Sequence, residues 1–476
     1  MSKKPIPNSQ DTPQKKTNPM NPTRRAFVGG TAAAGVGFWV AGGVQARPSR
    51  MAIDEISFAC VGIDGKGSSD SQACKDHGNV VAICDIDDQK MDNAKEKFGD
   101  IPRYNDYREM FDFMGDRIDA FTVSTPDHTH AVIALHGMRM KKHCFCQKPL
   151  THSIEEARMM GQVAREQEIV TQMGNQGTAE SALRQSAALI RAGIVGTVKE
   201  VHVWTNRPVW PQSIGLEVAE PEVPAHVHWD HWIGPAERRP YSPEIHPFKW
   251  RGFWAFGTGA LGDMACHTLN MSYMALDLKF PTSVVAEAKE HDGICYPESS
   301  KIKFEFPEYE GRAALQMHWY DGGERPAPEI LEGIPKRKDR QGRERHYTSA
   351  ALIIGEDGRR FFSPGDYGAD APEHTGLIDP DGNFTRLRRI EMEADWTQSP
   401  GHFTEFANAI NGEGTPVSNF PDYAGPLSET ILLGNLAVWS GEEVEWDAEN
   451  MIAKDASEDV EKIIRHDYLN GYTIHV

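Results

Sequence analysis

The sequence predicts an α/β protein with two folded domains, a doubly wound parallel sheet followed by an α+β domain on an open-faced, mostly antiparallel sheet. Between residues 53 and 173, short apolar runs alternate with helical patterns, which is typical of parallel strands joined by crossover helices. Between residues 283 and 354, strand-like runs follow one another without regular helices, which favours antiparallel pairing. The 476 residues suffice for two or three domains of about 150 residues each.

The first 46 residues are predicted to be an export leader and not a domain. Residues 1–22 are polar and rich in Pro, Asn and Lys, a composition typical of disorder. Arg24 and Arg25 precede an uncharged run from Val28 to Val44, an arrangement that resembles a twin-arginine signal peptide. A membrane anchor is the alternative, but the run is short and rich in glycine. We therefore expect export by the twin-arginine machinery to the periplasm or the extracellular space.

Charge and cysteine content narrow the range of partners. The formal net charge is −19, and because the first 46 residues hold six basic side chains and one acidic, the rest of the chain carries −24. Because so acidic a protein repels a phosphate backbone, nucleic acid is not expected as a partner. Seven cysteines in so long a chain do not form a disulfide framework, and we expect buried, reduced thiols.

A glycine-rich turn follows the first predicted strand, residues 53–63, and precedes a helical pattern at residues 71–76. Strand, glycine turn and helix are the fingerprint of a Rossmann dinucleotide-binding fold, in which glycines let the backbone approach a pyrophosphate at a helix N-terminus. Asp64 stands where the G-x-G-x-x-G pattern has its second glycine, and nothing in the sequence explains an acid there. The predicted cofactor-binding residues of this turn are Gly62, Asp64, Gly65 and Gly67.

The second predicted strand, residues 79–86, carries Asp85 near its end, 18 residues after Gly67. An acid at this position of the fingerprint accepts hydrogen bonds from the adenosine ribose hydroxyls, and its charge repels a 2′-phosphate. We therefore expect NAD as the cofactor in preference to NADP.

The same pattern continues to residue 175, so the predicted dinucleotide-binding domain is 51–175. The further strands are predicted at 118–124, 143–146 and 168–173, and the helices at 109–114, 131–140 and after a capping box at Ser153–Glu156. Ligands on such sheets bind beyond the carboxyl ends of the strands. Four residues that directly follow strands should therefore line one crevice: Gly62, Asp85, Thr125 and Lys148.

Residues 176–476 are predicted to form the α+β domain, in which substrate binding is expected. Its expected helices are 178–191, 401–410 and 426–440, and its expected strands are 197–205, 283–289, 301–306, 313–319 and 351–354. Residues 204–256 form an aromatic-rich insert with six of the eleven Trp. Flat aromatic faces suit sugar rings, and the equal alternative is that they pin the insert to the sheet. Histidines 226, 228 and 231 match no metal-binding spacing, and no metal site is predicted.

The chain resembles the Gfo/Idh/MocA family of glucose–fructose oxidoreductases and inositol dehydrogenases. The matching segments occur in the family's order over more than 200 residues: Gly62–Gly67, Asp85, Thr125–His130, Gln147–Pro149 and Gly262–His267. Residues 229–235 and 250–254 resemble a longer, often exported branch of the family. The resemblance covers nearly the whole chain after residue 51.

The resemblance implies roles for individual residues. Lys148 matches the lysine of a Glu-Lys-Pro motif between nicotinamide and substrate, although Gln147 replaces the glutamate. His267 matches a general base paired with Asp263, and on a helix the two would share a face, so the carboxylate is expected to raise the pKa of the imidazole. The predicted catalytic residues are thus Lys148, Asp263 and His267, the further cofactor residues are Thr125, Pro126 and His130 together with Lys148, and the substrate residues are Trp250, Arg251, Trp254 and His267.

Three functions remain open at this point. The first is an NAD(P)-dependent oxidoreductase that moves hydride between a sugar or polyol hydroxyl carbon and a tightly bound nicotinamide cofactor. The second is an NAD-dependent glycoside hydrolase that oxidises a ring hydroxyl, eliminates the aglycone, adds water and re-reduces the product, as in the NAD-dependent α-N-acetylgalactosaminidases that this family also resembles. The third is a non-catalytic sugar-binding protein. The family's sheet often serves oligomer contacts, so a homo-oligomer is expected.

Overall fold

The computed structural model describes residues 55–475, except 214–217, 369, 455 and 458–459. The predicted leader lies outside the described residues and stays a prediction. Among the residues that the structure describes, no helix combines the length and the apolar character that a membrane crossing requires.

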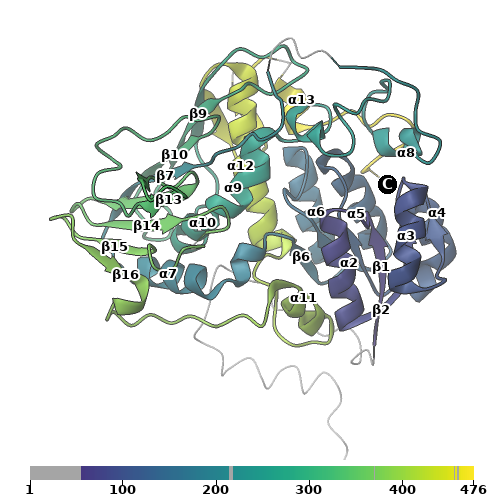
Figure 1. Ribbon diagram of the computed structural model, residues 1–476, viewed down its shortest axis with the longest axis horizontal. Helices are drawn as coiled ribbons and strands as arrows, with labels where there is room; N and C mark the ends of the chain where they lie inside the picture. The colour runs from purple at the N-terminus through teal and green to yellow at the C-terminus, as the bar shows by residue number, and fades with distance from the viewer. Residues whose placement is uncertain (1–54, 214–217, 369, 455, 458–459, 476) are drawn as a thin grey trace, which may run out of the picture. The chain divides into compact units, whose positions relative to one another are not determined.

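The first sheet has six strands in the order β3-β2-β1-β4-β5-β6, and every neighbouring pair is parallel. Helices α2 and α3 pack on one face with α11, and α4, α5 and α6 pack on the other (Figure 1). The predicted doubly wound sheet is therefore confirmed. Its strands are β1 (Ile56–Val61), β2 (Gly78–Cys84), β3 (Arg103–Tyr104), β4 (Ala120–Val123), β5 (His143–Cys146) and β6 (Thr171–Met173). Its helices are α2 (Lys66–His77), α3 (Asp88–Phe98), α4 (Tyr107–Met114), α5 (Asp127–Arg139), α6 (Ile154–Glu166) and the later α11 (His402–Ile410).

Local side-chain chemistry explains where two of these helices begin. The predicted capping box at α6 is confirmed, because the Ser153 hydroxyl accepts from the Glu156 N–H and the Glu156 carboxylate accepts from the Ser153 N–H. Helix α3 was not predicted. Asp87 caps its N-terminus, but Met91 is its only buried residue, so the sequence lacks an apolar stripe at helical spacing.

The second sheet has ten strands in the order β16-β15-β14-β13-β7-β10-β9-β8-β17-β18. Its neighbouring strands are antiparallel except β7 and β10, which run parallel, so the mostly antiparallel sheet is confirmed. The strands are β7 (Val198–Trp204), β8 (Ser283–Ala288), β9 (Ser300–Phe306), β10 (Leu315–Tyr320), β13 (Ala350–Gly355), β14 (Arg360–Pro364), β15 (Gly376–Ile378), β16 (Phe384–Arg386), β17 (Val444–Asp447) and β18 (Ile452–Lys454). A separate hairpin joins β11 (Arg337–Lys338) and β12 (Glu344–Arg345).

Helices cover one face of the second sheet and join it to the first. The long helix α12 (Gly425–Ser440) packs against α6 on one side and against β8, β9 and α9 on the other, which explains why it is buried along most of its length. The opposite face is covered in part by Leu331 and Ile334, and it leaves Lys303 and His318 half-exposed on β9 and β10. The remaining helices are α7 (Ser181–Arg191), α8 (Trp229–Ile233), α9 (Gly259–Thr268), α10 (Asn270–Leu276) and α13 (Glu461–Ile464), with single turns η1 (Gly115–Arg117), η2 (Gln176–Ala179), η3 (Lys249–Gly252), η4 (Leu387–Arg389) and η5 (Phe420–Ala424).

Candidate active site

A cavity of about 490 Å³ lies at the carboxyl ends of strands β1, β2, β4 and β5. The structure brings together there the four strand-end residues that the sequence placed in one crevice: Gly62, Asp85, Thr125 and Lys148. Pro126, at the start of α5, also lines it. Parallel strands present all their carboxyl ends at one edge, and the cavity is the consequence.

The glycine turn brings the backbone close to this cavity. At Gly62 (φ +76°) an added Cβ would lie 2.5 Å from the carbonyl oxygen of Ser124, so no larger residue fits. At Gly67 a Cβ would lie 2.1 Å from the Gly62 oxygen, so this glycine permits α2 to pack against the turn and does not itself line the cavity. Gly65 (φ +55°) is different, because the space where its Cβ would stand is open. The turn thus leaves room at the N-terminus of α2.

The acid that departs from the glycine pattern has a partner. The Asp64 carboxylate pairs with the Lys90 ammonium at 2.8 Å, and this contact lowers the pKa of Asp64. Lys90 lies in the first turn of α3 and also lines the cavity. A negative group bound at the turn would therefore face a neutralised carboxylate and not a bare one.

Asp85 lies beyond the end of β2 and faces the cavity. One carboxylate oxygen accepts from the N–H of Ile63 at 3.0 Å, and the other accepts from the N–H of Asp87 at 3.1 Å. Burial raises the pKa of Asp85 to about 6, against the opposite effect of these two hydrogen bonds. Each oxygen keeps a further lone pair that a hydroxyl in the cavity can use.

A buried carboxylate that the sequence did not single out connects two strand ends to the start of α2. Asp70 on α2 accepts hydrogen bonds from Gln147 Nε2 at 2.7 Å, Ser124 Oγ at 2.8 Å and Lys66 Nζ at 2.9 Å. Its side chain is 4% exposed. The carboxylate that the family's motif carries at position 147 is thus replaced by a glutamine that donates to a carboxylate on α2. The available signal in the sequence was an acid next to the predicted helical region that follows the glycine turn.

The predicted catalytic lysine is held by one shared carboxylate. Lys148 Nζ donates to Asp263 Oδ1 at 2.8 Å and to the Asp263 carbonyl oxygen at 2.7 Å, and Arg251 Nε contacts the same Oδ1 at 3.3 Å. Burial alone raises the pKa of the Asp263 carboxyl, but Lys148 and Arg251 outweigh it and lower that pKa to about 2. Two cations therefore share one carboxylate, with Lys148 and Arg251 both facing the cavity.

His267 differs from the expectation in its charge state. Asp263 is occupied by Lys148 and Arg251, and His267 Nδ1 has no hydrogen-bond partner among the described residues. Burial, together with the positive charge of Lys148, lowers the pKa of His267 well below its ordinary value. The expected rise is therefore wrong, because burial and the charge of Lys148 outweigh the raising effect of Asp263. The ring is 3% exposed and packs edge-on against Tyr367 at 4.8 Å between centroids.

Neither Asp263 nor His267 lines the cavity, and two other predicted ligand residues have structural contacts instead. The ring nitrogens of His130 lie 2.9 Å and 2.8 Å from the carbonyl oxygens of Pro149 and Thr125, so this buried ring braces the loops after β5 and β4 and does not line the cavity. The prediction that Trp254 contacts the substrate is wrong. Its ring stacks on Tyr296 at 3.6 Å, its N–H donates to a main-chain carbonyl, and it does not line the cavity, whereas Trp250 and Arg251 do.

Several lining residues come from distant parts of the chain. Asp127 is fully buried at the start of α5, where burial raises the pKa of its carboxyl to about 7 although Thr258 donates a hydrogen bond to it. The insert adds His231, Trp232, His246, Pro247 and Phe248, and the C-terminal segment adds Tyr472. Sequence spacing carries no signal for such contacts, because more than eighty residues separate these segments from the strand ends they cover.

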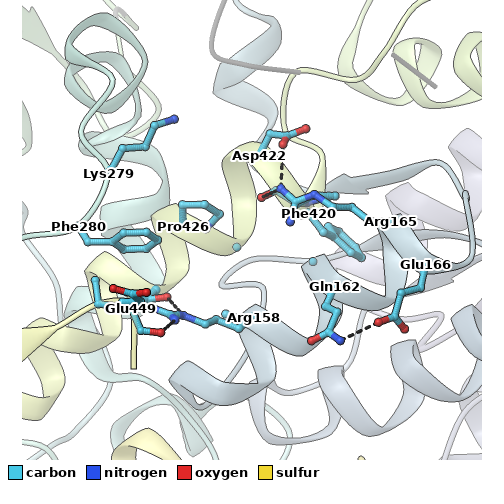
Figure 2. A pocket seen from close by; sticks show the side chains of 16 residues that line it. Arg158, Gln162, Arg165, Glu166, Lys279, Phe280, Phe420, Asp422, Pro426 and Glu449 are labelled. Atoms are coloured by element: carbon cyan, nitrogen blue, oxygen red, sulfur yellow. Dashed lines mark hydrogen bonds and ion pairs between the residues drawn. The ribbon is translucent and has the colours of Figure 1, made fainter. Parts of the chain in front are cut away.

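A second, larger cavity of about 850 Å³ lies between α6, η5 and α12 (Figure 2). Two arginines that line it are paired with carboxylates that also line it: Arg158 with Glu429 and Arg165 with Asp422. It shares no lining residue with the strand-end cavity. Among the described residues, no group of three or more His, Cys, Asp or Glu is placed to hold a metal ion. All seven cysteines are buried and unpaired, as predicted.

Comparisons with known proteins agree with this geometry. A model described as "Oxidoreductase family, NAD-binding Rossmann fold" matches residues 56–175, and one described as "Oxidoreductase family, C-terminal alpha/beta domain" matches residues 183–311. Both represent the Gfo/Idh/MocA family, and together they span more than half of the chain.

Individual relatives match over shorter stretches. Myo-inositol 2-dehydrogenase of Thermotoga maritima is 22% identical over 136 residues, 29% of this chain and 40% of that protein. Levoglucosan dehydrogenase of Pseudarthrobacter phenanthrenivorans is 24% identical over 190 residues, 40% of each chain, so the chain spans well under half of these relatives. The solved WlbA dehydrogenase of Bordetella pertussis, in complex with NADH and UDP-GlcNAcA, shares the fold at 16% identity and a TM-score of 0.54, over 83% of this chain and 99% of that one. Because the two family models match more than half of the chain, and the parallel sheet and strand-end cavity agree with them, this chain belongs to the Gfo/Idh/MocA oxidoreductase family.

Proposed function

We propose that this protein is an NAD-dependent oxidoreductase that moves a hydride between a hydroxyl-bearing carbon of a sugar or polyol and a nicotinamide cofactor. The observation that carries the proposal is the group at the end of β5, where Lys148 and Arg251 share the carboxylate of Asp263. Two cations around one carboxylate leave net positive charge beside the cavity, and such charge stabilises alkoxide character on a reacting hydroxyl. The names of the two curated relatives support a polyol or an anhydrosugar as the substrate class.

The residues of the cavity fit a nicotinamide dinucleotide. The open space at Gly65, before the N-terminus of α2, suits a pyrophosphate. Asp85 has lone pairs available for ribose hydroxyls, and its charge disfavours a 2′-phosphate, which supports NAD over NADP. When bound, the cofactor accepts or returns the hydride, and the protein aligns the substrate and handles its proton.

His267 is suited to take that proton. Because its lowered pKa keeps the imidazole neutral at pH 7, the ring can act as an acceptor. Lys148 would hold the hydroxyl oxygen while His267 takes the proton from it. Asp263 would position Lys148, because both its carboxylate and its carbonyl oxygen accept from the lysine.

A second candidate is a glycoside hydrolase that uses NAD transiently. The cover that the insert and the C-terminal segment form over the cavity favours it, since an enclosed cofactor suits a cycle that returns it to its starting oxidation state. We also propose export through the twin-arginine route. The leader sequence supports export, and the buried, unpaired cysteines mean that the fold needs no oxidising compartment.

The test uses the purified full-length protein, loaded with NAD⁺ and freed of excess nucleotide. Sugars and polyols are screened for reduction of the bound cofactor at 340 nm, and nitrophenyl glycosides are screened for release of nitrophenol without added cofactor. Reduction by a sugar or polyol supports the dehydrogenase, and glycoside cleavage supports the hydrolase. Lys148→Met should abolish either signal, whereas Lys289→Met, at a surface ion pair, should not. Sugar binding without either reaction would refute both enzymatic proposals and favour a non-catalytic binding protein.

A further inference from the structure

The C-terminal segment returns to the dinucleotide-binding sheet. We call residues 465–475 the C-terminal strap. Figure 1 shows the end of the chain beside α4, α5 and α8. Ile474 is fully buried, its carbonyl oxygen accepts from Arg139 of α5, and Tyr472 lines the strand-end cavity. The last residues of the chain are therefore part of the wall of the candidate active site.

The strap holds the loop that follows α8. The Leu469 N–H donates to the carbonyl oxygen of Pro235 at 3.0 Å. The Asn470 side-chain amide donates to the carbonyl oxygens of Gly234 and Ala236, both at 2.9 Å, and its own oxygen accepts from Arg238. One asparagine thus satisfies two main-chain carbonyls of the loop after α8, and fixes the end of the helix that carries Trp232 into the cavity.

The start of the same helix is tied to the end of β2. The His228 N–H donates to the carbonyl oxygen of Ile86 at 2.8 Å, and the Asp88 N–H donates to that of His226 at 2.9 Å. The His226 ring lies 3.1 Å from the Asp87 carboxylate. Helix α8 is therefore held at one end by the segment that follows β2 and at the other by the strap.

The position of Tyr472 identifies what it would contact. Asp85, at the end of β2, is the ribose-binding candidate, and β3 is the next strand outward from β2. A base attached to that ribose would be held by residues of the β3–α4 junction, where Tyr107 lines the cavity. The Tyr472 ring lies there, 9% exposed, with the Arg108 guanidinium 4.5 Å from its centroid. Trp232, stacked on a neighbouring tryptophan at 4.5 Å, adds a second flat wall.

We propose that the C-terminal strap is a latch that closes the adenine subsite and makes the dinucleotide a slowly exchanging, resident group. The proposal rests on the proposed function, because it takes the cavity to be a dinucleotide site. Tyr472 supplies an aromatic wall for the base, and Asn470 keeps α8 in place over the ribose. Release of the dinucleotide then requires the strap to detach from the Gly234–Ala236 loop. The release rate therefore depends on contacts between the strap and this loop, which lie away from the reacting groups.

The experiment measures cofactor exchange in the full-length protein. Protein loaded with NAD⁺ is diluted into excess isotope-labelled NAD⁺, and the bound nucleotide is followed with time by mass spectrometry after rapid desalting. Tyr472→Ala and Asn470→Ala should exchange at least tenfold faster than the unaltered protein. Tyr472→Phe keeps the ring and should exchange within twofold of it. The control is His475→Ala, which alters an exposed strap residue outside the cavity.

The outcomes separate the two proposals. If the dinucleotide binds and both alanine variants exchange within twofold of the unaltered protein, the latch is refuted while the proposed function stands. If the unaltered protein binds no dinucleotide at micromolar concentrations, the proposed function fails and the latch with it. Equal acceleration by His475→Ala would also overturn the latch, because it would show general loosening of the segment.

Discussion

Replacement of Lys148 by methionine tests how the two cations around Asp263 are balanced. The Asp263 carboxylate is 14% exposed, and Lys148 is the nearer of its cations, at 2.8 Å against 3.3 Å for Arg251. The difference between the ordinary pKa of 3.8 and the value of about 2 corresponds to ~2.5 kcal/mol at 1.36 kcal/mol per pKa unit. Burial opposes this lowering, so the two cations together contribute more. Lys148→Met should therefore lower the free energy of unfolding at pH 7 by about 3 kcal/mol.

The pH dependence of this loss has a definite sign. Because the folded-state pKa of Asp263 is depressed, the stability it confers is fully present above about pH 4 and is lost as pH falls from 4 toward 2. In urea unfolding, the difference between the unaltered protein and Lys148→Met should thus shrink to roughly half by pH 3. Lys289→Met should cost no more than about 1 kcal/mol. A loss no larger than in this control, or one of the same size at pH 3 and pH 7, would refute the assigned pairing.

Three further predictions concern the same cavity. Asp85, with a pKa raised to about 6, is charged above that pH and neutral below it, so the preference for NAD over NADP should be larger at pH 7.5 than at pH 5.5 in calorimetric titrations, and Asp85→Asn should remove this difference. His267→Gln should lower kcat at least about 100-fold with little change in unfolding temperature, as steady-state kinetics and thermal melting would show. Because the pKa of His267 is depressed, its protonation should cause no fall in kcat/KM between pH 8 and pH 6 in a pH–rate profile of the unaltered protein. Asp70→Ala leaves the Gln147 amide without its buried acceptor and should cost about 2–4 kcal/mol in urea unfolding, whereas Asp76→Ala, exposed on the same helix, should cost under about 1 kcal/mol.

Sequence patterns predicted the features that depend on neighbouring residues in the chain, namely the strands, the helices and the residues at strand ends. Short apolar strands between helices predicted the parallel sheet, and the strand ends then predicted that Lys148 and Asp85 would share a cavity. The resemblance implied that Asp263 and Lys148 both face the substrate, but it paired Asp263 with His267. The contact of Asp263 with Lys148 was not predicted, because no spacing rule connects residues 115 positions apart.

Features that depend on which segments meet in space could not be predicted in the same way. The aromatic-rich insert was expected to offer Trp254 to a sugar, but Tyr296 covers that ring, and the spacing of tryptophans carries no information about their neighbours. The pKa of His267 was expected to rise because its one-turn neighbour is acidic, yet burial of the ring and the charge of Lys148 outweigh that neighbour, and neither effect can be read from the spacing. Tyr472 covers the cavity from the C-terminal strap, and the sequence of the strap carries no motif that predicts where it packs.

The glutamine at position 147 can be understood only together with Asp70, and a charge swap tests this. Gln147 Nε2 lies 2.7 Å from Asp70 Oδ2, so Gln147→Glu would bring the family's usual residue into contact with a second buried carboxylate. Two carboxylates at that distance cannot both ionise without cost, and we expect a loss of about 2–4 kcal/mol in urea unfolding. The double change Gln147→Glu with Asp70→Asn restores one carboxylate and one amide in exchanged positions, and should recover most of that loss, with a coupling of at least about 1 kcal/mol. Additive losses in this double-mutant cycle would show that Asp70 and Gln147 are independent, and that the departure from the family's motif has some other cause.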